Sequence, residues 1–170
     1  MPGMPTYTTD FGSLENFRKG KVEIIDDDPR RYAFSNIFEV ASSAQPYEKV
    51  AVGKNRQYVL EAVRAEGTSE WRTSPHDEFA LVMDGEVEIR LQKLGPDDIG
   101  PSAERGSNAL QAEPSGPQMG SVIARRGHMT LLPVGAAYQF HADRPSVILM
   151  QTQEGPDTVY RWNEIVQTAP

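Results

Sequence analysis

The stretch HDEFALVMDG, residues 76–85, decides the fold of this chain. It joins a short run of β-forming apolar residues to an Asp-Gly pair, and six residues separate Glu78 from Gly85. The segment that follows, EVEIRLQ at 86–92, alternates between apolar and polar residues, as a strand with one buried face does. Since Asp-Gly is typical of tight turns between strands, the sequence predicts a hairpin here.

Short segments of the same kind fill most of the chain, each rich in β-branched or aromatic residues and bounded by Gly, Pro, Asn or Asp. They read YAFSNIFEVA, QYVLEAVRAE, SVIARRG, MTLLPVG, AYQFHAD and SVILMQTQ. Between residues 95 and 120, 12 of 26 residues are Gly, Pro or Ser, which predicts a long loop. We therefore expect an all-β fold with one barrel domain at 31–170, preceded by an N-terminal arm at 1–30.

Composition excludes several classes of protein. The 170 residues suit a single domain, and a net charge of −7 argues against nucleic acid or an anionic membrane surface as a partner. No apolar run approaches the length of about 20 residues that a membrane span needs. The sequence has no cysteine, which is consistent with the cytoplasm and excludes thiolate chemistry.

Two sequence skeletons resemble the motifs of the cupin family, which are small jelly-roll barrels. The first family motif ends in Glu, six residues and Gly, and Glu78 and Gly85 match that end. The second family motif begins with Gly, five residues, Pro, one residue and Gly, and it is matched by Gly127, Pro133 and Gly135. The resemblance covers residues 55–153 and implies a single-domain cupin with the long loop lying between the two motifs.

The metal ligands of the family are missing from these skeletons. The His-any-His pair of the first motif falls on Arg72 and Ser74, or on Trp71 and Thr73, and the histidine position of the second motif is Tyr138. Only Glu78 remains of the expected ligands. Because a transition metal needs about three protein ligands, we expect no metal on this chain.

A metal site outside the family pattern is the alternative. His76 and Glu78 share a strand face, so that His76, Glu78 and His141 form a fallback ligand set. His141 is three residues from Tyr138, which places it on the opposite face unless a bulge intervenes. Otherwise Glu78 is a structural anchor, with Arg72, His76 and the Tyr138 hydroxyl as available partners.

A closer resemblance covers most of the chain. GKVEIIDDDPRRYAFSNIFEVAS, EKVAVGKN and GTSEWRTSPHDEFALVMDGEVEIRL together resemble the small subunits of two-subunit hydroquinone 1,2-dioxygenases. The resemblance implies a larger cupin-type partner subunit that carries Fe(II), and insertion of O2 into hydroquinone to give 4-hydroxymuconic semialdehyde. It implies that this chain supports assembly and lines the active site, with no catalytic residue of its own.

Four residues are candidates for contact with the small aromatic substrate: Trp71, Arg72, Tyr138 and Phe140. Trp71 has two interpretations, since its indole fills the space left by the metal or projects into a shared active site. The arm and the segment after it, residues 1–50, contain a surplus of aromatic side chains, from which we expect part of this segment to pack on the partner.

Two other functions remain open. A self-sufficient metallo-cupin, either an oxygenase or an isomerase, would use His76, Glu78 and His141. A binding module would hold a small aromatic ligand in the apolar barrel without chemistry. Metal analysis of the purified chain separates the dioxygenase subunit from the metallo-cupin.

Overall fold

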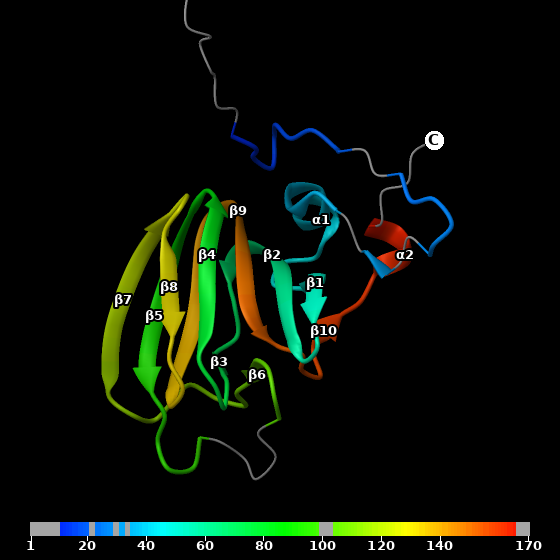
Figure 1. Cartoon of the computed structure of the whole chain (residues 1–170). Helices are drawn as coiled ribbons and strands as arrows, with labels where there is room; N and C mark the ends of the chain where they lie inside the picture. The colour runs from blue at the N-terminus through cyan, green and yellow to red at the C-terminus, as the bar shows by residue number, and fades with distance from the viewer. Residues whose placement is uncertain (1–10, 21–22, 29–30, 33–34, 99–103, 166–170) are drawn as a thin grey trace, which may run out of the picture.

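The computed structural model describes residues 11–20, 23–28, 31–32, 35–98 and 104–165. Within them the chain is built mainly of strands, with two short helices (Figure 1). The strands are β1 Lys49–Asn55, β2 Tyr58–Thr68, β3 Arg72–Thr73, β4 Glu78–Asp84, β5 Glu86–Lys93, β6 Asn108–Ala109, β7 Gln118–Arg125, β8 Met129–Leu132, β9 Ala136–Gln153 and β10 Thr158–Val159. The helices are α1 Ile37–Ser43 and α2 Trp162–Ile165.

The sheet curls around the long strand β9, which the sequence suggested as two separate strands (Figure 1). The first part of β9 pairs with β3 and β5, and its second part pairs with β2 and β4. Apolar side chains of these strands meet inside the curl, where Val82, Ile89 and Ile148 are fully buried. The predicted all-β, single-domain jelly roll is confirmed.

The predicted hairpin at Asp84 and Gly85 is wrong. β4 forms ladders with β8 and β9, whereas β5 forms ladders with β7 and β9, and the two strands share no ladder. Gly85 has a φ of +78°, so the chain turns sharply there as the dipeptide suggested. The turn carries the chain from the ladders of β4 with β8 and β9 to the ladders of β5 with β7 and β9.

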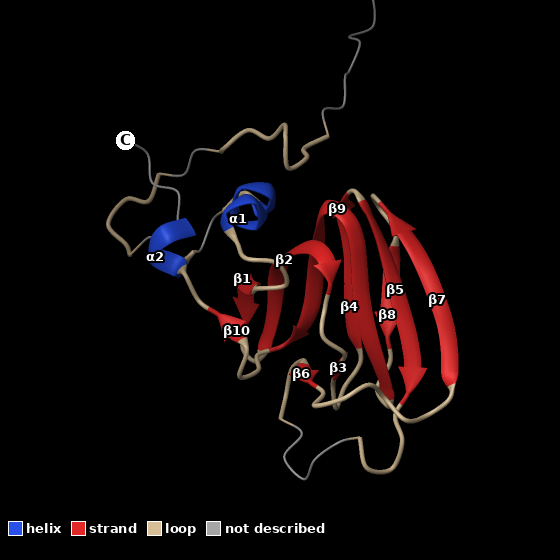
Figure 2. Cartoon of the chain, turned by 180° about the vertical axis from the view of Figure 1, so that it is seen from behind, coloured by secondary structure: helices blue, strands red, loops and turns tan. Residues whose placement is uncertain are grey.

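The segment YAFSNIFEVA contains a helix where the sequence predicted a strand. The Asn36 side chain accepts hydrogen bonds from the backbone N–H groups of Phe38 and Glu39, which caps the first turn of α1. Helix α1 lies against the outer face of the sheet (Figure 2), where Val40 and Ala44 pack on Val50 and Ala62. Tertiary packing of an apolar helix face therefore overrides the β preference of the aromatic residues.

The described part of the arm covers the same outer face. Leu14 and Phe17 pack against Phe38 and Val147, and the Leu14 N–H donates to Asp84 Oδ2 at 2.9 Å. The loop that the sequence predicted over residues 95–120 ends earlier than expected, because β7 already begins at Gln118. No helix in the described ranges is long and apolar enough to cross a membrane.

Candidate functional site

The centre of the site is a hydrogen bond between the two motif skeletons. The Tyr138 hydroxyl donates to Glu78 Oε2 at 2.7 Å, and both side chains are buried. Glu78 begins β4 and Tyr138 lies near the start of β9, which brings the two residues together inside the barrel. The sequence named the Tyr138 hydroxyl as an available partner of Glu78, and the hydrogen bond confirms it.

A chain of hydrogen bonds continues from Tyr138 to the surface. Ser107 Oγ lies 2.8 Å from the Tyr138 oxygen and accepts from Arg72 Nε at 2.5 Å. Tyr138 gives its single hydrogen to Glu78, so it accepts from the Ser107 hydroxyl. Arg72 also pairs with Asp157, and the chain of hydrogen bonds ends at that exposed carboxylate.

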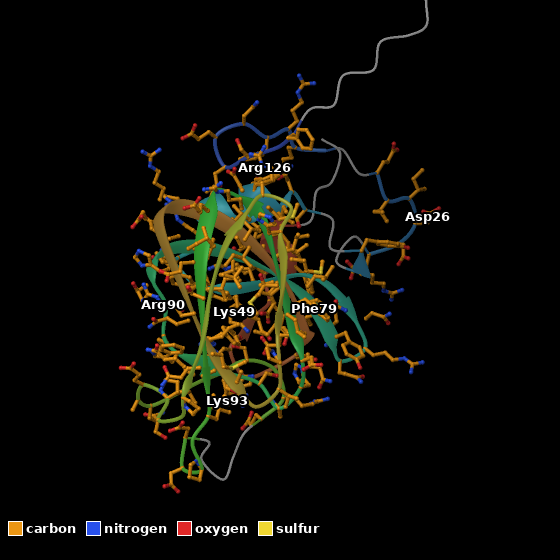
Figure 3. All side chains as sticks on the ribbon, turned by 90° about the vertical axis from the view of Figure 1, so that its left-hand side faces the viewer. Asp26, Lys49, Phe79, Arg90, Lys93 and Arg126 are labelled. Atoms are coloured by element: carbon orange, nitrogen blue, oxygen red, sulfur yellow. The ribbon has the colours of Figure 1, made fainter. Side chains whose placement is uncertain are left out.

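Lys49 supplies a buried positive charge beside this centre. Its Nζ lies 2.8 Å from Glu61 Oε2, and the Thr158 hydroxyl donates to Glu61 Oε1 at 2.8 Å. Figure 3 shows Lys49 in the middle of the molecule among the strands, whereas Arg90 lies on the outer side. A buried ion pair of this kind needs both partners, because the loss of one leaves an uncompensated charge in the core.

The environment shifts the pKa values of the two central residues upward. Burial raises the pKa of Glu78, while the Lys49 ammonium and the hydrogen bond from Tyr138 oppose that rise. Burial and the nearby Glu78 carboxylate raise the pKa of Tyr138 well above its ordinary value. Tyr138 therefore keeps its proton and acts as a hydrogen-bond donor at any physiological pH.

The side chains at the family's metal position do not fit a metal ion. Glu78 Oε2 is occupied by Tyr138, and Arg72 and Ser74 stand in one register for the histidine pair. No cluster of three His, Cys, Asp or Glu side chains able to hold a metal occurs among the described residues. We therefore derive no step of chemistry through a metal on this chain.

The fallback ligands do not come together. His76 Nδ1 lies 3.0 Å from the Asp77 carbonyl oxygen, and His76 Nε2 accepts from the Gly106 N–H at 3.1 Å. His141 lies on the outer face of β9, where Nδ1 is 2.7 Å from Thr68 Oγ1 and Nε2 is 3.0 Å from Asp143. His141 thus points away from Glu78, as the strand alternation predicted.

The substrate-contact candidates divide between two hollows. Arg72, Tyr138 and Phe140 line a cavity of about 340 Å³ at the barrel interior, together with Lys49 and Tyr47. Trp71 lines a separate groove of about 590 Å³ over β5 and β7, whose walls are mostly polar. Trp71 lies immediately before β3, and its side chain faces a different hollow from that of Arg72, the first residue of β3.

Most residues of the cavity were missed from the sequence, among them Lys49, Ser107 and Tyr47. Lys49 lies on β1, far from either motif, and because a lysine on a strand usually faces solvent, no sequence signal indicated that it turns inward. Ser107 comes from the long loop and Tyr47 from the turn before β1. Neither position carries a periodic signal, because loop residues reach a site through tertiary structure alone.

Comparison with known proteins gives the family. No family model and no curated protein matches the chain. A crystal structure of hydroquinone 1,2-dioxygenase PnpCD with Cd²⁺ and 4-hydroxybenzonitrile contains a chain that is 52% identical, with a TM-score of 0.87, over 98% of this chain and 100% of that one. The hydroquinone 1,2-dioxygenase from Sphingomonas sp. TTNP3 with 4-hydroxybenzoate bound gives 55% identity and a TM-score of 0.89, over 97% and 100% of the two chains. The chain belongs to the hydroquinone 1,2-dioxygenase family. The resemblance seen in the sequence is confirmed.

Hydroquinone 1,2-dioxygenases also contain a second, longer kind of chain with a related fold. In PnpCD in complex with Fe³⁺, a 10% identical chain matches with a TM-score of 0.59. The match covers 86% of the present chain and 42% of the longer one, which makes the longer chain about twice as long. At this identity the likeness concerns the fold alone.

Proposed function

We propose that this chain is the small, non-metal-binding subunit of an Fe(II)-dependent hydroquinone 1,2-dioxygenase. The observation that carries the proposal is full-length similarity to such enzymes at 52–55% identity, combined with a barrel in which Arg72 and Tyr138 replace metal ligands. The partner is a larger cupin-type subunit that holds the iron. The long chain of PnpCD, which also has a cupin-like half, supports this choice of partner.

The proposed reaction opens the ring of hydroquinone. Both atoms of O2 enter the product, one C–C bond of the ring breaks, and 4-hydroxymuconic semialdehyde forms. The iron of the partner supplies the activation of oxygen. This chain contributes assembly and part of the wall that surrounds the substrate, and we assign it no proton transfer.

Trp71 is the side chain on this surface that best suits contact with an aromatic substrate. It is half-buried in a groove whose other walls include Glu88, Arg90 and Gln139. A large ring held among polar side chains offers one apolar face to a partner or a substrate. We propose that this groove faces the larger subunit.

Co-expression tests the proposal. The chain and the larger cupin subunit encoded with it are produced together and separately, and oxygen uptake with hydroquinone is measured in each preparation. We expect uptake from the complex alone, with equal amounts of O2 and hydroquinone consumed. Full activity of the larger subunit without this chain would refute the proposal, as would activity of this chain alone.

The rival metallo-cupin has weaker support. It requires His76, Glu78 and His141 to converge, whereas His141 is engaged with Thr68 and Asp143 on the outer face. The proposed cytoplasmic location rests on the absence of cysteine and stays a prediction.

A further inference from the structure

Strand β7 has a longer free edge than the other edge strands of the described chain. Its ladder with β5 occupies one side, and it forms no second ladder within the described ranges. Figures 1 and 2 both show β7 as the outermost strand at one end of the sheet. The other strands with a single ladder partner, β6, β8 and β10, have two to four residues each, whereas β7 has eight. A free edge exposes unpaired N–H and C=O groups, and folded proteins usually keep such edges short.

The edge of β7 carries little that would prevent pairing with another strand. Natural edges are protected by lysine, by proline or by a bulge. β7 has neither Lys nor Pro, and its one charged residue, Arg125, stands at its end. The one irregularity of its ladder with β5 lies near its start, between Gln118 and Gly120. The stretch from Gly120 to Arg125 therefore presents a regular edge that a further strand can join.

Both faces of β7 are open as well. Residues 118–123 are all exposed, and they include Met119, Val122 and Ile123 at 44%, 39% and 52%. Val122 lies opposite the core residue Ile89 and shares its face of the sheet, whereas Ile123 lies on the other face. A strand placed beside β7 would cover apolar side chains on both faces, in addition to satisfying the edge.

The charges around β7 favour a second copy of this chain as the occupant of the edge. A net charge of −7 opposes contact between two copies through their acidic surfaces, whereas residues 118–124 carry no charge. Antiparallel pairing of β7 with itself brings the start of one strand to the end of the other. Exposed Arg125 and Arg126 stand at one end, and exposed Glu113 precedes the other, so opposite charges approach each other at both ends.

We infer that two copies of this chain pair through β7, antiparallel and about a two-fold axis, to form one continuous sheet. The axis passes beside Val122 or Ile123, because identical residues face each other at the centre of such a pair. In these two registers Arg125 lies opposite Met119 or Ser121, so no like charges meet. The pairing uses the edge of β7, and it is distinct from the groove over the face of β5 and β7 that we propose for the larger subunit.

The oligomeric state of the purified full chain tests the inference without the larger subunit, and therefore independently of the proposed function. Sedimentation equilibrium is measured for the wild type, for Ile123→Lys on β7, and for Met129→Lys on the edge strand β8 as the matched control. Both side chains are more than half exposed, so both variants should fold. Ile123→Lys removes apolar contact and places two ammonium groups beside the axis. We expect a dimer for the wild type and for Met129→Lys, and dimerisation at least about tenfold weaker for Ile123→Lys. A wild type that stays monomeric up to about 1 mM, or equal dimerisation of the two variants, would overturn the inference.

Amide hydrogen exchange locates the contact within the dimer. Between Gly120 and Arg125 every second N–H points away from β5, and it exchanges rapidly while the edge is free. We expect these amides to be protected in the wild-type dimer and to exchange rapidly in Ile123→Lys. A dimer that leaves them unprotected is formed through another surface and refutes the pairing. The measurement is repeated on the complex with the larger subunit, and protection that arises only there would mean that this partner, and no second copy, occupies the edge.

Discussion

Tyr138 donates a hydrogen bond to Glu78 across 60 residues of sequence, and it does so from the position at which cupins place a metal-binding histidine. Glu78 is the one residue of the family's ligand set that this chain keeps, and it pairs with a tyrosine hydroxyl instead of a metal ion. Ser107 and Arg72 extend this arrangement to the surface, so the former metal position is part of a continuous hydrogen-bonded structure.

The purified chain should contain no stoichiometric iron. Among the ligand positions of the two motifs, Arg72 has no lone pair to offer a metal, Ser74 is a poor ligand, and the Tyr138 hydroxyl keeps its proton and donates it to Glu78, whereas about three good ligands are required. Elemental analysis after purification without chelators checks this. One tightly held metal per chain, lost in Glu78→Ala or His76→Ala, would contradict it.

Glu78 should make the chain less stable as the pH rises. Because burial raises its pKa above the ordinary 4.5, the folded chain holds this proton more tightly than the unfolded chain does. The contribution of the protonated Glu78 to stability is complete below pH 4.5, the ordinary pKa of the group. It is lost as the pH rises through the raised pKa of the folded chain. Glu78→Gln cannot ionise, so its stability relative to the wild type should increase with pH. Urea unfolding of both proteins from about pH 4 to about pH 8 measures the difference, and parallel profiles would refute the interpretation.

Trp71→Ala should change the enzyme more than the fold. Removing a fully packed core tryptophan costs about 3–5 kcal/mol, whereas Trp71 is only half-buried in its groove, so we expect a much smaller loss. In the assembled enzyme Trp71→Ala should alter KM or kcat for hydroquinone, and Trp71→Phe should keep part of the function. A variant that assembles, melts and turns over as the wild type does would exclude both interpretations of this residue.

Deletion of residues 1–30 should weaken assembly with the larger subunit while the barrel stays folded. The deletion also removes Leu14 and Phe17 from the outer face of the sheet, which lowers stability. The double substitution Leu14→Ala, Phe17→Ala is the control, because it loses the same packing and keeps the arm. Size-exclusion chromatography of each complex separates the two effects, and an unchanged complex after deletion would argue against the arm as an interface.

The aromatic surplus behind that prediction is smaller than the sequence suggested. Phe38 is a buried residue of α1, and Tyr47 stacks on Phe140 in the cavity. Tyr32 remains 46% exposed, and Phe34 lies outside the described residues. Tyr32 and the described arm are therefore the parts of residues 1–50 on which the interface hypothesis now rests.

Gly85→Ala should destabilise the chain more than Gly127→Ala. Both glycines have positive φ values, +78° and +88°, which cost an alanine about 1–2 kcal/mol. A Cβ on Gly85 would also lie 2.1 Å from Ser146 Oγ and 2.8 Å from Ser146 Cβ, whereas a Cβ on Gly127 meets nothing within 4 Å. Thermal unfolding of the two variants gives the contribution of the clash by difference. Equal costs would mean that Ser146 moves aside freely.

The sequence predicted those parts of the fold that depend on short sequence patterns. Alternation in β5 and the spacing of the two motifs were sufficient for the barrel, and they placed Glu78 and Tyr138 correctly. Helix α1 was missed because its cap at Asn36 and its packing against Val50 outweigh a strand-like composition. Strand propensity alone cannot foresee either contribution.

The site was predicted less completely, for a physical reason. Residues on the motif strands have neighbours fixed by register, so Arg72 and Tyr138 could be grouped before the structure was known. Lys49 lies on β1 and Ser107 lies in the loop before β7. No local sequence pattern predicts that these two residues reach the cavity. Trp71 was expected in the space left by the metal or in a shared active site, but it lies just before β3 and lines a separate groove.

The position of β9 after three of the strands that pair with it has a consequence for synthesis. Strands β2, β4 and β5 each form one of their two ladders with residues 136–153. At about 5–20 residues per second, β2 leaves the ribosome on the order of ten seconds before β9 does. During that interval β2 can pair with β1, but its other edge has no partner strand, and an unpaired strand edge makes a nascent chain prone to aggregate. The barrel therefore closes only once β9 has been synthesised, and until then the edges of β2, β4 and β5 that face β9 stay unpaired.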